Sequence, residues 1–241
     1  MKHKIIGKEL PNIPFEPKPE GLDSPLWRYS NNPIIKMNPF PNASRVFNSA
    51  VMAYKGEFIG VFRADTKNGI PFLFVGHSKD GINFDFEIDP IVFHDKDGQP
   101  IKLEYAYDPR LVELEGTYYI IFCTSLRGPT LGVGKTKDFK YFELLDNPFL
   151  PFNRNGVLFP RKINGQYAMY SRPSDSGHTQ FGDIFLSYSN DLEYWGHHRH
   201  VMERGYEWWC GTKIEYGQNH LVVNTWRIGR LSFLGIRHHF Y

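Results

Sequence analysis

The sequence predicts an all-β fold, a β-propeller of about four blades with four strands each. Two interleaved repeats and the absence of convincing helical periodicity support this prediction. The chain has 241 residues, a length that fits one large all-β domain or two small domains. A hydrophobic content of 41% is enough for a sizeable core.

The first repeat is a turn motif, Ser/Thr-x-Asp-x-x-x-aromatic, and each copy follows a strand-like apolar run. The copies are Ser78-Lys79-Asp80 with Phe84, Thr136-Lys137-Asp138 with Phe142, and Ser189-Asn190-Asp191 with Trp195. An Asp at this position can accept hydrogen bonds from the backbone that follows, and the aromatic side chain can pack back under the turn. We therefore expect an Asx-type turn at the end of each strand.

The second repeat is a Gly between two apolar strands, at Gly56, Gly116 and Gly165. Tight hairpin turns need a positive φ, which Gly adopts at little cost. With the turn motif, these hairpins define units of about 55 residues with four strands, the content of one propeller blade. A β-sandwich with chance repeats is the alternative, although sandwiches lack a fixed long period.

The domain prediction separates an N-terminal extension from the propeller. Residues 1–32 are rich in Pro and polar groups, so we expect them to lie over the ring as an extension. Residues 33–241 then form a single propeller domain.

Composition excludes several classes of partner. The formal charge is +2, and no basic run tracks a phosphate backbone, which argues against nucleic acid. The two cysteines lack the spacing of a metal knuckle or a disulfide framework, and we expect neither a metal nor another cofactor. Since no signal peptide or membrane span is visible, we expect a cytoplasmic protein, with a homo-oligomer left open.

Unusual polar groups stand at the ends of four predicted inner strands, where propellers place their sites. They are Asn48 and Ser49 with Arg63 and Asp65, Tyr107 and Asp108 with Arg110, Arg154 and Asn155 with Arg172, and Lys213. Buried charge is expensive unless it is paired or used. We therefore expect these side chains to converge on one mouth of the central channel.

This set contains one prominent acid, Asp108, among several cations. Glycosidases ordinarily need two carboxylates. With inorganic phosphate as the nucleophile, held by Arg and Lys, the second carboxylate becomes unnecessary. The alternative interpretation is that these residues are ordinary Arg–Asp pairs that brace the blades.

Longer motifs carry a family resemblance between residues 34 and 214. They are Phe47-Asn48-Ser49-Ala50, Phe62-Arg63-Ala64-Asp65, Tyr107-Asp108-Pro109-Arg110, Asn153-Arg154-Asn155-Gly156-Val157-Leu158-Phe159-Pro160, Ser171-Arg172-Pro173-Ser174-Asp175, Gly177-His178-Thr179, Phe181-Gly182-Asp183-Ile184 and Thr212-Lys213-Ile214. In this order the chain strongly resembles glycoside hydrolase family 130, the β-mannoside phosphorylases.

The resemblance implies a five-bladed propeller and phosphorolysis with inversion, giving α-mannose 1-phosphate and a shortened acceptor. It implies that Asp108 is the general acid, whose proton reaches the glycosidic oxygen through the mannose 3-hydroxyl. It also implies binding roles, which we expect for phosphate at Arg154, Arg172 and Lys213, for mannose at Asn48, Ser49, Arg63 and Asp65, and for the acceptor at Tyr107, Asn155 and His178. The motifs look most like the branch acting on β-1,4-mannooligosaccharides or mannosyl-N-acetylglucosamine.

The resemblance ends after Ile214, and the family's Tyr-His-Gly motif, whose His contacts phosphate, is absent. A late Asp that helps the family bind mannose is absent as well. We therefore expect a divergent tail from residue 215 and an incomplete last blade, as in a truncated or frameshifted reading frame. An inactive mannoside-binding remnant and a β-mannoside hydrolase on the same fold are the alternative functions.

Overall fold

The computed structural model describes residues 16–24, 27–174 and 182–205, and these contain strands and turns without a helix. Three β-sheets follow one another along the chain, and their strands are antiparallel except for one parallel pair in the second sheet. This result confirms the predicted all-β class. Within the described ranges, no helix has the length and apolar character needed to cross a membrane.

Each sheet is one blade. The first blade contains, in order, β1 (Ala43–Tyr54), β2 (Glu57–Thr66), β3 (Pro71–Ser78) and β4 (Asp85–Phe86). The second contains β7 (Ala106–Leu114), β8 (Thr117–Thr124), β9 (Thr130–Thr136), β10 (Phe142–Leu144), β5 (Phe93–His94) and β6 (Pro100–Ile101). The third contains β11 (Asn153–Leu158), β12 (Tyr167–Pro173), β13 (Ile184–Ser189) and β14 (Trp195–Met202).

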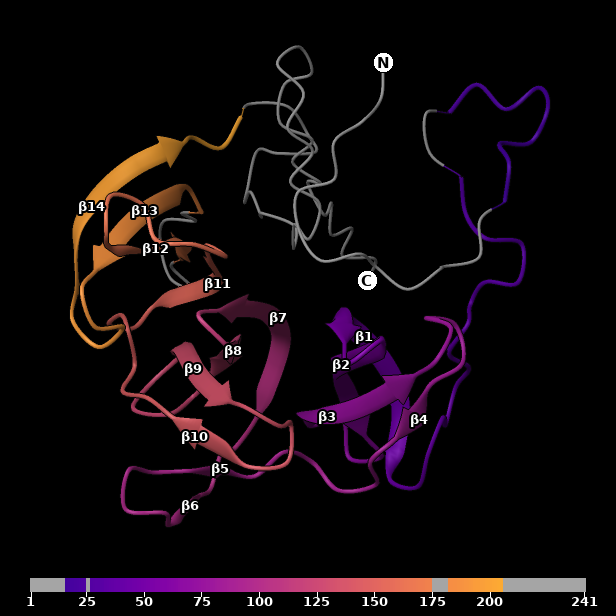
Figure 1. Ribbon diagram of the computed structural model, residues 1–241, viewed down its shortest axis with the longest axis horizontal. Helices are drawn as coiled ribbons and strands as arrows, with labels where there is room; N and C mark the ends of the chain where they lie inside the picture. The colour runs from indigo at the N-terminus through magenta and orange to yellow at the C-terminus, as the bar shows by residue number, and fades with distance from the viewer. Residues whose placement is uncertain (1–15, 25–26, 175–181, 206–241) are drawn as a thin grey trace.

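The three blades lie side by side along an arc, with β1, β7 and β11 on its inner side and β4, β6 and β14 on its outer side (Figure 1). The inner strand β7 contacts both β1 and β11. This is the radial arrangement of a propeller, in which the first strand of each blade lines the central channel. The predicted fourth unit, with Lys213, lies outside the described residues.

Both repeats take the predicted local structure. The hairpin turns pair a left-handed residue with a Gly, and φ is 50° and 85° at Lys55 and Gly56, 53° and 76° at Glu115 and Gly116, and 50° and 80° at Asn164 and Gly165. Two consecutive residues with positive φ make a type I′ turn, whose twist matches that of the flanking strands. Each of these hairpins joins the first and second strands of a blade.

The Asx turns are also confirmed, with the same bonds in all three copies. In the second copy, the Thr136 hydroxyl accepts the Phe139 N–H at 3.0 Å, and Asp138 Oδ1 accepts the N–H groups of Lys140 and Tyr141 at 2.9 and 3.1 Å. These backbone donors hold the pKa of the Asp138 carboxyl below its usual value. The turn therefore closes the third strand of each blade and sends the chain into the fourth.

The second blade departs from the predicted four strands, because β5 and β6 add a hairpin to its outer edge. Strand β5 runs parallel to β10, and Phe142 faces Phe93 across the pair. The Phe93 ring is buried and stacks on Phe122 at a centroid distance of 4.8 Å. Burying this ring stabilises the inserted hairpin by roughly 2 kcal/mol, a contribution that the repeat pattern does not reveal.

The first strand of the first blade starts at Ala43. Phe40 already belongs to the core and packs against Phe74 at a centroid distance of 4.9 Å. The described residues before Phe40 contain no strand, which leaves them outside the first blade.

Large rings cover glycines between the second and third strands of a blade. Gly60 faces Gly76 across β2 and β3, and the buried Phe62 ring lies over both. A Cβ added at Gly60 would lie 2.4 Å from Phe62 Cε2 and 2.9 Å from Val51 Cγ2. The packing of the blade core therefore requires a residue without a side chain at position 60.

We predict that Gly60→Ala lowers the free energy of unfolding by about 1–3 kcal/mol, because the Phe62 ring must leave its packed position. The matched control is Gly196→Ala in β14, where an added Cβ has no atom within 4 Å. Urea unfolding followed by fluorescence measures both variants. Equal stabilities of the two variants would contradict the packing argument.

Candidate active site

A β-bulge interrupts the inner strand of every described blade at a corresponding place. Two residues oppose one at Phe47 and Asn48 in β1, at Asp108 and Pro109 in β7, and at Asn155 and Gly156 in β11. Asp108 and Asn155 occupy the same position in their bulges, with left-handed φ values of 53° and 55°. Left-handed backbone is uncommon outside Gly, and Asp and Asn adopt it more readily than most other residues. The bulges therefore turn these two polar side chains out of the regular strand alternation.

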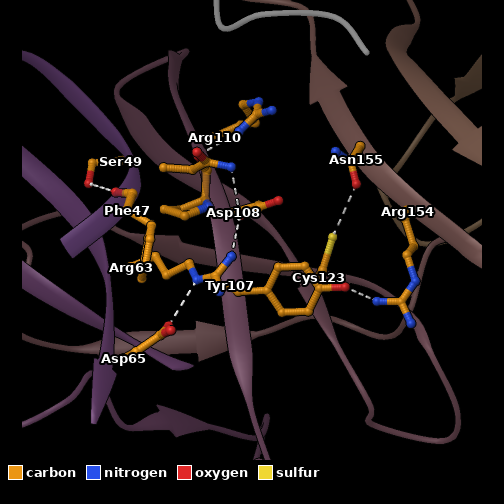
Figure 2. Close-up of polar contacts among 12 residues, drawn as sticks. Phe47, Ser49, Arg63, Asp65, Tyr107, Asp108, Arg110, Cys123, Arg154 and Asn155 are labelled. Carbon is orange, nitrogen blue, oxygen red and sulfur yellow. Dashed lines mark hydrogen bonds and ion pairs between the residues drawn. The ribbon is translucent and has the colours of Figure 1, made fainter. Parts of the chain in front are cut away.

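Asp108 contributes a buried carboxyl group to this site and is only 2% exposed. Its Oδ1 accepts hydrogen bonds from Asn48 Nδ2 at 2.9 Å and Arg63 Nη1 at 3.1 Å (Figure 2). Both donors belong to the first blade, whereas Asp108 belongs to the second. The carboxyl group is therefore fixed between two blades and shielded from bulk water.

Arg63 is held on four sides. Its Nε donates to Asp65 Oδ1 at 3.1 Å, while Nη1 pairs with Asp108. The guanidinium carbon also lies 5.0 Å from the centroid of the Phe47 ring and 5.3 Å from that of Tyr107, within cation–π range. Arg63 thus bridges two carboxylates while two rings restrict its orientation.

Tyr107 connects this acidic cluster to the third blade. Its hydroxyl accepts a hydrogen bond from Arg154 Nη1, and the Arg154 guanidinium also lies 5.7 Å from the ring centroid. One aromatic side chain thus contacts Arg63 and Arg154, on opposite sides of the site (Figure 2).

Two arginines face each other in the third blade, since Arg154 on β11 pairs directly with Arg172 on β12. Like charges at directly opposite positions in a sheet repel each other, and Arg172 is only 4% exposed. Within the described ranges, Arg154 forms no ion pair with a carboxylate. This pair of cations is suited to binding an anion.

Asn155 lies between the third blade and the second. Its Oδ1 accepts hydrogen bonds from Arg172 Nη2 at 3.4 Å and from the Cys123 thiol at 3.6 Å. Cys123 is fully buried, and desolvation raises the pKa of its thiol to about 12. The thiol is therefore protonated at neutral pH and can donate.

Most of the predicted site residues come together at the bulges. Ser49 is also here, although its hydroxyl donates to Phe47 O at 2.6 Å. His178 and Lys213 lie outside the described residues. The sequence predicted no role for Phe47 or Cys123. Cys123 pairs with Tyr107 across β7 and β8, and this strand register is the signal that could have indicated a role for Cys123.

The site contains no arrangement suited to a metal in the part of the chain that the structure describes, where no three His, Cys, Asp or Glu side chains cluster. Its chemistry rests on a buried carboxyl, an amide and several guanidinium groups.

Comparison with known proteins places this chain in a family. The model of glycoside hydrolase family 130, described as beta-1,4-mannooligosaccharide phosphorylase, matches residues 7–226. A beta-1,4-mannooligosaccharide phosphorylase of Ruminococcus albus is 51% identical over 210 residues, covering 84% of this chain and 63% of the relative. A beta-1,2-mannobiose phosphorylase of Listeria innocua is 32% identical, covering 55% of this chain and 37% of the relative. The chain thus spans less than two thirds of the length of these two relatives.

Solved structures confirm the fold. The beta-1,2-mannobiose phosphorylase of Listeria innocua, in complex with beta-1,2-mannobiose, superposes with a TM-score of 0.68 at 22% identity, covering 79% of this chain and 70% of that one. A second solved structure gives a TM-score of 0.60 at 21% identity, covering 90% of this chain and 68% of that one. Its description says that the GH130 family of mannoside phosphorylases contains glycoside hydrolases that target beta-1,2 mannosidic linkages. The family model's match over most of the sequence, together with the fold, shows that this chain belongs to glycoside hydrolase family 130.

Proposed function

We propose that the protein carries out inverting phosphorolysis of β-mannosides, with inorganic phosphate as co-substrate and α-mannose 1-phosphate as product. The observation that carries this proposal is the buried Asp108 carboxyl on one side of Tyr107, with the facing Arg154 and Arg172 on the other. The 51% identity to the Ruminococcus albus relative supports β-1,4-mannooligosaccharides as substrates. Mannosyl-N-acetylglucosamine is the second substrate to test.

Asp108 supplies the proton in this proposal. A carboxylic acid whose Oδ1 already accepts bonds from Asn48 and Arg63 carries its proton on Oδ2. That proton passes to the glycosidic oxygen, by way of the mannose 3-hydroxyl as the family resemblance implies. The bond from the anomeric carbon to this oxygen breaks, and the acceptor leaves as a neutral alcohol.

Phosphate supplies the new bond to carbon. An oxygen of the dianion attacks the anomeric carbon from the face opposite the leaving group, which inverts the configuration. Guanidinium groups bind phosphate oxygens through paired, charge-assisted hydrogen bonds. Arg154 and Arg172 are placed to do this, and Lys213 joins them in our proposal.

Hydrolysis on the same fold is the alternative reaction. An inverting hydrolase needs a second carboxylate as a base for water. The nearest candidate is Asp65, whose Oδ1 is held by Arg63 Nε at 3.1 Å. The Asp65 carboxylate is therefore already paired with Arg63, and the two arginines of the third blade favour phosphate as the nucleophile.

We expect the 241-residue chain to release mannose 1-phosphate from β-1,4-mannobiose only when phosphate is present. Asp108→Asn keeps the shape of the side chain but removes its acidic proton, so kcat should fall at least about a hundredfold. Ion chromatography separates mannose 1-phosphate from mannose, and Asp146→Asn, at an exposed ion pair, is the control. A wild-type rate in Asp108→Asn would exclude Asp108 as the acid.

Other outcomes separate the alternatives. Free mannose at a rate independent of phosphate would identify a hydrolase, and binding of mannobiose without turnover would identify an inactive remnant. A chimera that adds the part of the Ruminococcus albus relative outside the match should be assayed beside the chain. Turnover by the chimera alone would show that the 241 residues lack a necessary part.

We predict that Arg154→Met raises the KM for phosphate about tenfold or more while changing the KM for mannobiose little, because the proposed phosphate site loses one of its guanidinium groups. Tyr107→Phe is the matched control. It removes the hydroxyl that accepts the hydrogen bond from Arg154 and keeps the ring beneath the guanidinium. Initial rates at varied phosphate measure both variants. An unchanged KM for phosphate in Arg154→Met would remove Arg154 from the phosphate site.

We predict that Arg63→Met destabilises the protein by about 1–3 kcal/mol, because the buried Asp108 Oδ1 loses one of its two hydrogen-bond donors. Arg127→Met is the control, since the side chains of Arg127 and Asp146 are 75% and 74% exposed and such pairs contribute about 0–1 kcal/mol. Thermal and urea unfolding measure both. Equal effects would mean that the Arg63–Asp108 pair is not a structural link between blades.

A further inference from the structure

The side-chain amide of Asn155 is buried, and its two ends have different surroundings. Only 7% of the residue is exposed. The oxygen accepts from both Cys123 and Arg172. The nitrogen, Nδ2, is buried and has no hydrogen-bond partner in the part of the chain that the structure describes. One end of the amide is therefore satisfied twice, and the other not at all.

The two donors fix which way the amide faces. An Asn side chain can rotate by half a turn and exchange its oxygen and nitrogen. In the exchanged orientation, the NH₂ group would face the guanidinium of Arg172 and the thiol of Cys123, which are both donors. The observed orientation is therefore the favourable one, and it directs the NH₂ group away from Cys123 (Figure 2).

An unpaired buried NH₂ group costs free energy unless a ligand supplies an acceptor. The backbone indicates where this acceptor lies. Asn155 and Asp108 occupy the same position in equivalent bulges of neighbouring inner strands. The same backbone geometry thus presents an acid from one blade and an amide donor from the next to one channel.

Cys123 reaches this amide from the second blade. It lies on β8 behind the bulge, in register with Tyr107, and has no exposed surface. Its neighbours in the core cluster include Leu131 and Met169, so packing alone would allow an apolar residue of similar size. Its thiol donates to Asn155 Oδ1 at 3.6 Å, and the Asn155 backbone also contacts the sulfur.

We propose that Cys123 is a positioning residue, whose thiol acts with Arg172 to hold the Asn155 amide so that Nδ2 donates to an oxygen of the bound substrates. The acceptor is a sugar hydroxyl or a phosphate oxygen. The assignment of substrates rests on the proposed function, but the contact itself is testable by binding alone.

The experiment compares Cys123→Ala, which removes the donor, with Cys123→Ser, which keeps one. Calorimetry measures the dissociation constants of β-1,4-mannobiose and of inorganic phosphate separately, and initial rates give kcat and both KM values. We expect Cys123→Ala to weaken one of the two ligands about tenfold with kcat changed less than threefold. Cys123→Ser should recover most of the affinity. The ligand that is weakened identifies the acceptor.

Two further variants separate positioning from packing. Asn155→Asp replaces the NH₂ donor with an oxygen and should weaken the same ligand at least as much as Cys123→Ala. In the double variant, loss of the thiol should add little, because both changes act through one contact. Val133→Ala, in the same core cluster, should lower stability without changing either dissociation constant.

Several results would overturn the proposal. Equal weakening in Cys123→Ala and Cys123→Ser would mean that Cys123 acts by packing. Unchanged binding of both ligands in Asn155→Asp would mean that Nδ2 contacts neither, a conclusion that holds even if a Cys123 variant does not fold. Wild-type binding without phosphorolysis would contradict the proposed function and leave these binding comparisons valid.

Discussion

The bulge in each inner strand is the constraint on which the site depends. A regular strand alternates its side chains between two faces, and the inner strands need their apolar residues in the cores between blades. A bulge adds one residue and re-aims a side chain without disturbing the alternation further along. At Asp108 and Asn155 the backbone adopts a left-handed conformation, which costs free energy for most residues other than Gly and is tolerated best by Asp and Asn. The pairing of the surrounding strands offsets this local cost and holds the two polar side chains at the channel.

The contacts that hold these groups run between blades rather than within them. Asp108 is fixed by Asn48 and Arg63 of the first blade, and Asn155 is fixed in part by Cys123 of the second. Each blade therefore completes the site of its neighbour. A local loosening between blades would disturb the orientation of the acid before it unfolded any single sheet, so the function depends on how the blades pack together.

The sequence predicts much of this fold because its signals are local. The three type I′ hairpins and the three Asx turns follow from Gly and Asp at fixed offsets, and short-range geometry is enough to form them. The inserted strands β5 and β6 escaped prediction, because Phe93 is held by stacking on Phe122, a partner far away in the chain. The candidate site residues were predicted from motifs, but their partners were not. No pattern indicates that Asn48 and Arg63 bind the acid, or that Cys123 binds Asn155, since these contacts form only when blades dock.

The division of charge across the site bears on the stereochemistry of the proposed reaction. The first two blades contribute Asp65, Arg63 and Asp108, in which the cation is neutralised by the carboxylates on either side of it. The third blade contributes the facing Arg154 and Arg172. Tyr107 lies between the two groups and contacts a guanidinium of each. An anion is therefore attracted to the side away from the acid. A sugar bound between them would have its leaving oxygen near Asp108 and its opposite face toward phosphate, which is the arrangement that inversion requires.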